Sequence, residues 1–267
     1  LSGMKNIDEE YSAKRVHGEV LKTILNAYRA GTSRLLLLDY DGTLIPFFDR
    51  PDAAVPDPDL ISLFSDISSD KNTHIAIISG RNVEFLERHF SGLQMTLIAE
   101  HGAWIKLQGD EWKAATTEDS AWKNDIRPIL ESYCDRTPGT FIEEKEFSLA
   151  WHYRRSDSEL ASMRAMELKG DILHMIANRN LGIMEGNKVL EIKSLEISKG
   201  KIAGFLLSTT QYNFILAIGD DNTDEDMFAA IPEWGHTIKV GFGPSRAKYV
   251  VDGIRTVRNI LGQLGTK

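Results

Sequence analysis

Four consecutive leucines, Leu35–Leu38, end abruptly in the polar sequence Asp39-Tyr40-Asp41-Gly42-Thr43. A run without any polar position is typical of a parallel strand that is buried on both faces. Similar short apolar runs occur at 75–78, 96–99 and 214–218, next to sequences with helical periodicity. This alternation predicts an α/β fold in which helices cover both faces of a doubly wound parallel sheet.

Helices are expected on either side of these strands. Apolar residues between Val16 and Tyr28 recur every three or four positions, which indicates a helix over 8–30. Asp57 followed by Pro58 marks a helix start, because an aspartate caps the first free N–H groups and proline has none to satisfy. The remaining periodicity predicts helices at 83–90, 199–208, 224–230 and 253–264, and strands at 237–240 and 249–251.

Between residues 104 and 192 the pattern changes to a mixture of α and β. The turn sequence Gly109-Asp110 predicts a β-hairpin. A helix is expected near 120–133, and Pro128 within it opposes its continuity, because proline lacks the N–H that a helix needs. The other elements expected in this stretch are strands at 140–145, 147–154, 182–184 and 188–193, and a helix near 158–177.

The length and these patterns predict more than one domain. With 267 residues the chain is about right for two. We therefore expect an N-terminal helical segment at 1–33, a parallel-sheet core formed by 34–103 together with 193–267, and a separate α/β unit inserted at 104–192.

The composition excludes several classes of protein. There are 31 Lys and Arg against 39 Asp and Glu, a net charge of −8, and an acidic surface repels the phosphates of nucleic acids. No apolar run approaches the roughly 18 residues of a membrane-spanning helix, and the first twenty residues do not resemble a secretory signal. A single cysteine, Cys134, rules out an internal disulfide and favours a reducing, cytoplasmic location.

Ligands of open α/β sheets bind beyond the carboxyl ends of the strands, and two of these ends carry unusual chemistry. Asp39 and Asp41 lie two residues apart on an extended chain and share a face, where they repel each other unless a cation lies between them. Ser79, after the strand at 75–78, offers a hydroxyl beside the free N–H groups of a helix start, which suit an anion.

A third strand end, after 214–218, is strongly acidic. Five of the seven residues from Asp220 to Asp226 are carboxylates, and oxygen ligands of this kind favour a hard cation such as Mg²⁺. Lys199, at the start of the preceding helix, is placed to neutralise a phosphate. Each feature alone is more often a turn or a helix cap, but their coincidence at three strand ends is specific.

These residues resemble the motifs of the haloacid dehalogenase superfamily of phosphohydrolases. The family's Asp-x-Asp-Gly-Thr is matched at 39–43, its strand-terminal Ser or Thr by Ser79, its lysine by Lys199 and its Gly-Asp-Asp from Gly219. Within that superfamily, five stretches look like trehalose-6-phosphate phosphatases: Leu-Leu-Asp-Tyr-Asp-Gly-Thr-Leu (37–44), Ile-Ser-Gly-Arg (78–81), Ala-Glu-His-Gly-Ala (99–103), Ser-Leu-Ala-Trp-His-Tyr-Arg (148–154) and Gly-Asp-Asp-Asn-Thr-Asp-Glu-Asp-Met-Phe (219–228). The likeness covers nearly everything after residue 34.

The resemblance implies a Mg²⁺-dependent phosphatase of trehalose biosynthesis, which converts trehalose-6-phosphate to trehalose and phosphate. Asp39 would be the nucleophile that forms an aspartyl-phosphate, and Asp41 the general acid and base. The same likeness places Mg²⁺ on the Asp39 carboxylate, the Asp41 carbonyl and the Asp220 carboxylate. Thr43, Ser79 and Lys199 complete the catalytic set, which contacts the transferring phosphoryl group.

The resemblance makes 34–103 and 193–267 the catalytic core and 104–192 the α/β cap domain. The substrate would be a sugar phosphate, recognised largely by this cap. Charged and amide groups suit a sugar, because they exchange hydrogen bonds with its hydroxyls. The expected substrate-binding residues are Gly80, Arg81, Glu100, His101, Glu143, Lys145, His152, Arg154, Asn187, Lys188, Glu191, Asp221 and Asp224. The N-terminal helix resembles a joining segment, so a trehalose-phosphate synthase, fused or associated, is an expected partner, whereas nucleic acid and membrane are not.

Three alternatives remain open from the sequence. One is another capped sugar phosphatase of the superfamily, acting on sucrose phosphate or mannosyl-3-phosphoglycerate with different cap contacts. A second is a phosphomutase, which would have to shield its aspartyl-phosphate from water. The third is a catalytically silent regulatory domain of a trehalose-phosphate synthase, although such a domain would have no need of the complete set of motifs.

Overall fold

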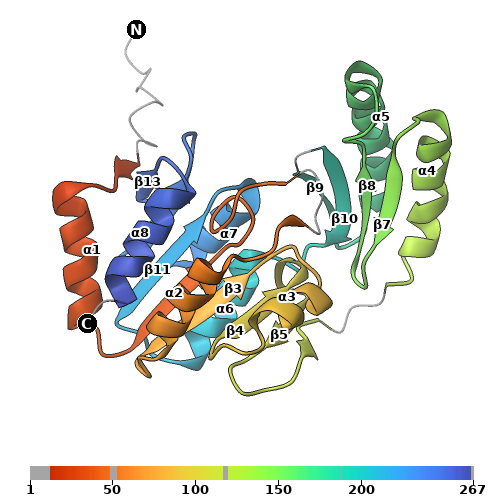
Figure 1. The fold of residues 1–267 in the computed structure, drawn as a ribbon. Coiled ribbons are helices and arrows are strands. Elements are labelled where there is room, and N and C mark those ends of the chain that lie inside the picture. The colour runs from red at the N-terminus through yellow and green to blue at the C-terminus, as the bar shows by residue number, and fades with distance from the viewer. Residues whose placement is uncertain (1–12, 49–52, 117–119, 187, 266–267) are drawn as a thin grey trace, which may run out of the picture. The chain divides into compact units, whose positions relative to one another are not determined.

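The structure is a computed structural model, and it describes residues 13–48, 53–116, 120–186 and 188–265. The chain divides into two compact units. Unit 1 consists of Leu1–Ala115 and Ser198–Lys267, and unit 2 of Thr116–Ile197. Figure 1 shows the elements of both units along the chain.

A nine-stranded sheet forms the centre of the described part of unit 1, in the order β1-β13-β12-β11-β2-β3-β4-β5-β6. In this order, every neighbouring pair from β1 through β4 is parallel, and only the pairs β4–β5 and β5–β6 are antiparallel. The strands are β1 (Lys14–Arg15), β2 (Arg34–Leu38), β3 (Thr73–Ile78), β4 (Thr96–Ala99), β5 (Trp104–Lys106), β6 (Lys113–Ala114), β11 (Phe214–Gly219), β12 (His236–Val240) and β13 (Tyr249–Val251).

Helices cover both faces of this sheet, as the leucine run predicts. Leu36 and Leu38 pack into the core under α1, α2, α3 and α8, whereas Leu35 and Leu37 pack into the core under α6 and α7. The doubly wound α/β fold is therefore confirmed (Figure 1). The helices are α1 (Gly18–Ala30), α2 (Pro58–Ser68), α3 (Val83–Phe90), α6 (Lys199–Thr209), α7 (Asn222–Ala230) and α8 (Ile254–Gly265).

The centre of the sheet is the point at which the chain reverses its direction of winding. β2 pairs with β3 on one side and with β11 on the other. The Asp39 N–H continues the β2–β11 pairing by donating to the Ile218 carbonyl at 3.0 Å. Ligand sites of such sheets lie at this reversal, and here Asp39 and Asp220 follow the two central strands directly.

The helix expected at 8–30 is shorter at its start in the structure. Residues 1–12 lie outside the described residues, and Lys14–Arg15 is a strand, β1, that pairs in parallel with β13. The helix begins only at Gly18, where φ is +47°, after an extended His17. A backbone at positive φ does not continue a right-handed helix, so residues 13–17 are not part of α1.

Unit 2 contains an antiparallel sheet with its two described helices on one face. The strand order is β7-β8-β10-β9, and residues such as Leu149, Trp151 and Ile192 point into a core shared with both helices. The elements are α4 (Lys123–Arg136), β7 (Phe141–Glu144), β8 (Ser148–His152), α5 (Ser158–Ile176), β9 (Leu181–Gly186) and β10 (Val189–Ser194).

Two features of the stretch at 104–192 differ from expectation. Helix α4 continues through Pro128, because Ile126, Leu130 and Tyr133 are buried against the sheet and hold the turns on both sides of the proline. The hairpin at 104–114, which we expected in the cap, pairs through β5 with β4 and extends the sheet of unit 1.

None of the helices in the described part of the chain combines the length and the hydrophobicity that crossing a bilayer requires.

Candidate active site

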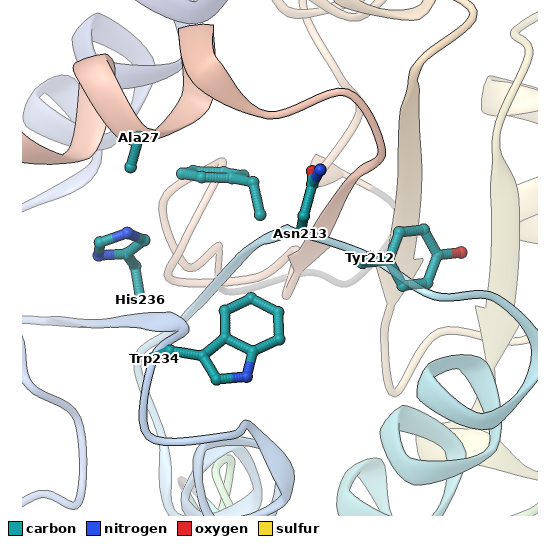
Figure 2. Close-up of a pocket in the computed structure, with 6 residues that line it drawn as sticks. Ala27, Tyr212, Asn213, Trp234 and His236 are labelled. Atoms are coloured by element: carbon teal, nitrogen blue, oxygen red, sulfur yellow. The ribbon is translucent and has the colours of Figure 1, made fainter.

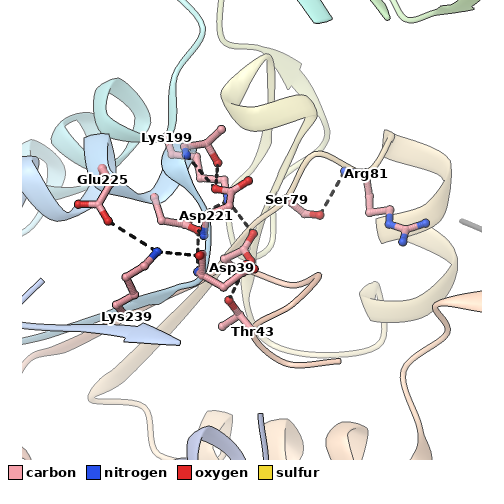
Figure 3. A network of polar contacts seen from close by, with 11 residues as sticks. Asp39, Thr43, Ser79, Arg81, Lys199, Asp221, Glu225 and Lys239 are labelled. Carbon is pink, nitrogen blue, oxygen red and sulfur yellow. Dashed lines mark hydrogen bonds and ion pairs between the residues drawn. The ribbon is translucent and has the colours of Figure 1, made fainter. Parts of the chain in front are cut away.

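A buried lysine and two buried carboxylates occupy the carboxyl ends of the central strands (Figure 3). Lys199 Nζ donates to Asp39 Oδ1 at 2.6 Å and to Asp224 Oδ1 at 2.8 Å. The three side chains are 1%, 7% and 0% exposed. Lys199 is the first residue of α6, behind the cap that Ser198 Oγ forms by accepting the Lys201 N–H. Packing of α6 on the sheet thus places the Lys199 amine at the carboxyl end of β2.

Negative charge is in excess at this site. Burial raises the pKa of Asp39 to about 7 against the opposing effect of Lys199. Burial, together with Asp221 and Asp224, raises the pKa of Asp220 to about 7. Burial alone would lower the pKa of Lys199, but Asp224 and Asp39 outweigh it and raise that pKa above its ordinary value. The Lys199 ammonium by itself does not balance these carboxylates, and a further cation would stabilise their ionised forms.

The donor set fits a hard divalent cation. Carboxylate oxygens of Asp39, Asp220 and Asp224 lie within 4.8 Å of one another. Asp39 Oδ2 is buried and accepts no hydrogen bond from the described residues, which is a costly arrangement unless an ion binds there. The oxygens of Asp224 are already engaged, so Asp39 and Asp220 are the residues whose carboxylates suit Mg²⁺.

The turn after β2 brings Gly42 and Thr43 against Asp220. Gly42 has φ of +83°, and a Cβ there would lie 2.3 Å from Asp220 Oδ2 and 2.6 Å from Phe47 Cζ. Thr43 is fully buried, and its Oγ1 lies 3.4 Å from Asp220 Oδ1 as a hydrogen-bond donor. The Asp-Gly-Thr sequence therefore matters for its shape as well as for its polar groups.

Asp41 is paired with Arg81. Arg81 Nε donates to Asp41 Oδ2 at 2.8 Å and Arg81 Nη2 to Asp41 Oδ1 at 2.5 Å. The Arg81 N–H donates to Ser79 Oγ at 3.1 Å, and the guanidinium lies over the Phe85 ring, 4.8 Å from its centroid. The two-pronged geometry fixes the plane of the Asp41 carboxylate and joins the first two predicted motifs.

Glu100 and His101 form a left-handed turn that supports the Ser79–Arg81 loop. Their φ angles are +50° and +58°, which are uncommon for residues other than glycine. The Glu100 N–H donates to the Arg81 carbonyl at 2.9 Å and the His101 N–H to the Ser79 carbonyl at 2.8 Å. A Cβ at Gly80 would lie 2.5 Å from His101 Nε2, so the imidazole packs directly on that glycine.

Asp221 and Asp224, which we expected to bind substrate, have structural partners within the acidic loop. Asp221 caps α7, because its Oδ1 accepts the Thr223 N–H at 2.8 Å. Asp224 Oδ2 accepts the N–H groups of Asp220 and Asp221 at 2.9 and 3.0 Å. Since Asp224 is completely buried, its carboxylate holds the acidic loop in place and does not face a ligand.

One functional candidate, Lys239, was missed by the sequence reasoning. Lys239, at the end of β12, donates from Nζ to the Asp220 carbonyl at 2.7 Å, and Glu225 Oε1 lies 3.8 Å from the same amine. The sequence does contain a signal that could have identified Lys239: a lysine between Ile238 and Val240 interrupts a buried strand. Its partner across the sheet could not be predicted from that pattern.

In unit 2, several of the expected sugar-binding residues meet on the sheet face opposite the helices. His152 Nε2 lies 2.8 Å from Glu143 Oε2. Glu191 Oε1 accepts from Ser148 Oγ at 2.6 Å and lies 3.5 Å from Lys145 Nζ. Glu143 and Glu191 both align with Ala150 of the strand between them, so alternation along the strands brings these charges together.

Two further expected cap residues, Lys188 and Arg154, lie elsewhere. Lys188, with φ of +64°, places its Nζ 5.7 Å from the centroid of the Tyr153 ring, which packs against the helix-covered core. Arg154 is exposed in the turn after β8. Asn187 lies outside the described residues.

A separate pocket of about 450 Å³ lies at the amino ends of β11 and β12 (Figure 2). Its lining is aromatic and amide in character, and Asn213 within it accepts the N–H groups of Thr32 and Ser33 at 3.0 Å. The lining residues are Ala27, Tyr212, Asn213, Phe214, Trp234 and His236. No carboxylate is among them, so this pocket lacks the chemistry found at the opposite ends of the same strands.

Comparison with known proteins assigns this site to a family. A family model described as trehalose-phosphatase matches residues 37–252, which include both acidic strand ends and the whole of unit 2. The chain belongs to the trehalose-phosphatase family. It is thereby a member of a family of phosphoric monoester hydrolases, and the resemblance found in the sequence motifs is confirmed.

An individual relative agrees with this assignment. The chain is 40% identical over 231 residues to the "Bifunctional trehalose-6-phosphate synthase/phosphatase" of Thermoproteus tenax. The matched region covers 86% of this chain and 32% of the relative. The chain thus spans about a third of that protein's length.

Solved structures support both the fold and the family. The C-terminal domain of the Candida albicans trehalose-6-phosphate phosphatase superposes with a TM-score of 0.87 at 30% identity, covering 95% of this chain and 99% of that one. A haloacid dehalogenase-like hydrolase from Bacteroides thetaiotaomicron superposes with a TM-score of 0.61 at 14% identity, covering 85% and 99%. This second likeness shows the fold alone.

Proposed function

We propose that this chain is a Mg²⁺-dependent phosphatase that hydrolyses trehalose-6-phosphate to trehalose and inorganic phosphate through an aspartyl-phosphate on Asp39. One observation carries the proposal: Asp39 is held by Lys199 through Oδ1, while its buried Oδ2 accepts no hydrogen bond from the described residues. The names of the relatives supply the substrate, and the site supplies the chemistry.

The reaction divides into two displacements at phosphorus. A carboxylate oxygen of Asp39 attacks the phosphoryl group, the bond to the sugar oxygen breaks, and Asp41 gives that oxygen a proton. Water then attacks the aspartyl-phosphate and loses its proton to Asp41, and the bond from phosphorus to Asp39 breaks. Asp39 is thereby regenerated and phosphate leaves.

Charge is the main obstacle, because a carboxylate must approach a phosphate dianion in a site with little water. Lys199 offsets this repulsion from the Asp39 side. The Asp39 carboxylate, the Asp41 carbonyl and the Asp220 carboxylate would hold Mg²⁺, which when bound supplies positive charge to the phosphoryl oxygens. Thr43 and Ser79 would donate hydrogen bonds to the same oxygens.

Arg81 contributes to the proposed site in a second way. Its guanidinium holds both oxygens of Asp41, and a guanidinium has five N–H donors. We infer that the guanidinium orients Asp41 in the ionised form that accepts the proton of the attacking water, and that its positive charge also attracts the incoming phosphate.

We assign sugar recognition to the face of unit 2 that carries Glu143, Lys145 and Glu191. Carboxylates accept from hydroxyl groups and ammonium groups donate to them, so this set can satisfy a polyhydroxylated ligand. The expected consequence is that Glu191→Gln raises the KM for trehalose-6-phosphate more than it lowers kcat.

The family's relatives include a bifunctional synthase/phosphatase. We propose that a trehalose-phosphate synthase, fused or associated, is this protein's partner, because its product would be the substrate of the site described above.

The proposal is tested by phosphate release from trehalose-6-phosphate, glucose-6-phosphate, sucrose-6-phosphate and mannosyl-3-phosphoglycerate, with and without Mg²⁺. We expect release that needs Mg²⁺ and prefers trehalose-6-phosphate. Asp39→Asn should abolish it, whereas the same change at the exposed Asp59 of α2 should not.

Each other outcome has a definite meaning. A preference for a different sugar phosphate would keep the chemistry and reject the substrate. Substantial activity of Asp39→Asn would reject the covalent route. No release from any of the four compounds would favour a regulatory domain instead of an enzyme.

A further inference from the structure

A second buried lysine lies on the other side of the acidic loop from Lys199. Lys239 is only 8% exposed, and its Nζ donates to the main-chain carbonyl of Asp220 at 2.7 Å. Lys199 meanwhile holds Asp224 at 2.8 Å. The acidic loop that follows β11 is therefore held by Lys199 through the side chain of Asp224 and by Lys239 through the main chain of Asp220 (Figure 3).

Lys239 is itself part of a larger polar cluster. Glu225 Oε1 lies 3.8 Å from Lys239 Nζ and accepts from Ser245 Oγ at 2.7 Å. Glu225 Oε2 accepts the Arg246 N–H at 2.6 Å. The cluster of Lys239, Glu225 and Ser245 thus ties the start of α7 to the end of β12 and to the loop that follows it.

We propose that Lys239 is a positioning residue that holds Asp220 in the orientation required for cation binding. This inference rests on the proposed function, in which the Asp220 carboxylate holds Mg²⁺. Lys239 acts through the Asp220 carbonyl, and the Asp220 side chain then lies beside Gly42 and Thr43. Groups that orient a metal ligand in this way commonly change affinity or activity by roughly 10- to 100-fold when they are removed.

Simple electrostatics predicts the opposite change in cation affinity when Lys239 is removed, which makes the inference testable. A lysine close to a cation site repels the cation, so its removal should strengthen binding if charge alone mattered. If Lys239 acts by orienting Asp220, its removal weakens binding despite the lost repulsion. The direction of the change in Mg²⁺ affinity therefore separates the two roles.

The test uses the full chain and measures cation binding without substrate. Binding of Mn²⁺, as a spectroscopic substitute for Mg²⁺, is measured by the loss of the free ion's electron paramagnetic resonance signal. We expect Lys239→Met to raise the Kd about tenfold or more, and Lys239→Arg, which keeps a donor and a charge, to raise it less. The Mg²⁺ concentration that gives half-maximal phosphate release should shift in the same direction.

The matched control is Lys248→Met. Lys248 Nζ also donates to a main-chain carbonyl, that of Gly235 at 2.9 Å, but at the opposite end of β12. We expect no change in its Mn²⁺ Kd. If Lys239→Met folds poorly, the double variant Lys239→Met/Glu225→Gln removes the ion pair as a whole and should show the same loss of binding.

An unchanged or lower Kd in the folded Lys239 variants would overturn the inference. Asp220→Asn separates this failure from a failure of the proposed function. If Asp220→Asn loses Mn²⁺ while Lys239→Met binds normally, the cation site stands and only the role of Lys239 is wrong. If Asp220→Asn binds as well as the parent chain, the proposed cation site itself is wrong.

Discussion

At the scale of single residues, Gly42 shows how closely the site depends on backbone shape. Its φ is +83°, and a Cβ at this position would lie only 2.3 Å from Asp220 Oδ2, so both features exclude a side chain. Gly109 has the same φ of +83°, but nothing lies within 4 Å of its Cβ position. Comparing substitutions at these two glycines therefore separates the cost of backbone strain from the cost of contact with Asp220.

Gly42→Ala should consequently cost more than Gly109→Ala. We expect Gly109→Ala to lower the free energy of unfolding by about 1 kcal/mol, the cost of a left-handed alanine. Gly42→Ala should cost about 1–3 kcal/mol more, because crowding is added, and should also weaken cation binding by displacing Asp220. Urea unfolding and Mn²⁺ titration measure both effects, and equal behaviour of the two variants would contradict this account of the turn.

His74 predicts how stability depends on pH. Its Nδ1 lies 2.8 Å from Tyr212 Oη and its Nε2 2.7 Å from Thr96 Oγ1. Burial lowers the pKa of His74, so the unfolded chain binds a proton more readily than the folded chain. The stability that neutral His74 provides is present above about pH 6.5 and is lost as the pH falls below that value.

The expected result is that His74→Gln flattens the acid side of the stability curve. The difference in free energy of unfolding between parent and variant should change between pH 7 and pH 5, by up to about 1.4 kcal/mol per pH unit. Thermal unfolding at several pH values measures it. The exposed His174 of α5 provides the control, and a parallel pair of curves for parent and His74→Gln would count against the interpretation.

At the scale of elements, α4 shows packing prevailing over local preference. A proline inside a helix costs about 3 kcal/mol, because it removes a hydrogen bond and contacts the preceding turn. Pro128 lies nearer the surface, while Ile126 and Leu130 on either side of it are fully buried. Burial of such side chains contributes roughly 1.5–3 kcal/mol each, which is enough to keep the helix continuous.

Pro128→Ala should therefore stabilise α4. We expect a gain of about 2 kcal/mol, somewhat less than the full cost of the proline, because alanine also gives the unfolded chain more freedom. Hydrogen exchange of the α4 amides measures the gain locally, with Glu131→Ala on the same helix as the control. Slower exchange only in the Pro128 variant is the expected outcome, and unchanged exchange would show that the proline is not a weak point.

The elements also show which features the sequence predicts and which it does not. The buried strand β2 and the acidic ends at Asp39 and Asp220 could be predicted, because apolar runs and strand-end motifs are local patterns. The strand β1 could not, because it depends on pairing with β13, more than two hundred residues away. The same holds for Lys239, whose role depends on a carbonyl contributed by a neighbouring strand.

The cap residues illustrate the same limit. Glu143, Lys145, Lys188 and Glu191 could be named only through the family resemblance, and their spacing could not decide which of them lie together. In the structure, alternation along the antiparallel strands puts Glu143 and Glu191 on one face, whereas Lys188, with a positive φ in the turn before β10, lies near Tyr153. Local charge patterns identify candidates, and the conformation of a single turn decides which of them meet.

At the scale of the whole molecule, the fold explains why the two acidic motifs work as one site. They lie about 180 residues apart in the chain, yet β2 and β11 are neighbours at the reversal of the sheet. The chain between them supplies β3 to β6 and the whole of unit 2. An insertion of this kind leaves the central strand pair intact and adds a second unit.

The most direct test of the central claim is a search for phosphate on Asp39 itself. Asp41→Asn should retain attack on p-nitrophenyl phosphate, whose leaving group needs no proton, but should hydrolyse the aspartyl-phosphate slowly. After acid quenching, mass spectrometry should then find one phosphoryl group on the peptide that contains Asp39, together with a burst of about one equivalent of p-nitrophenol. If the variant releases p-nitrophenol steadily and that peptide never carries phosphate, Asp39 is not the nucleophile and the account of this site is wrong.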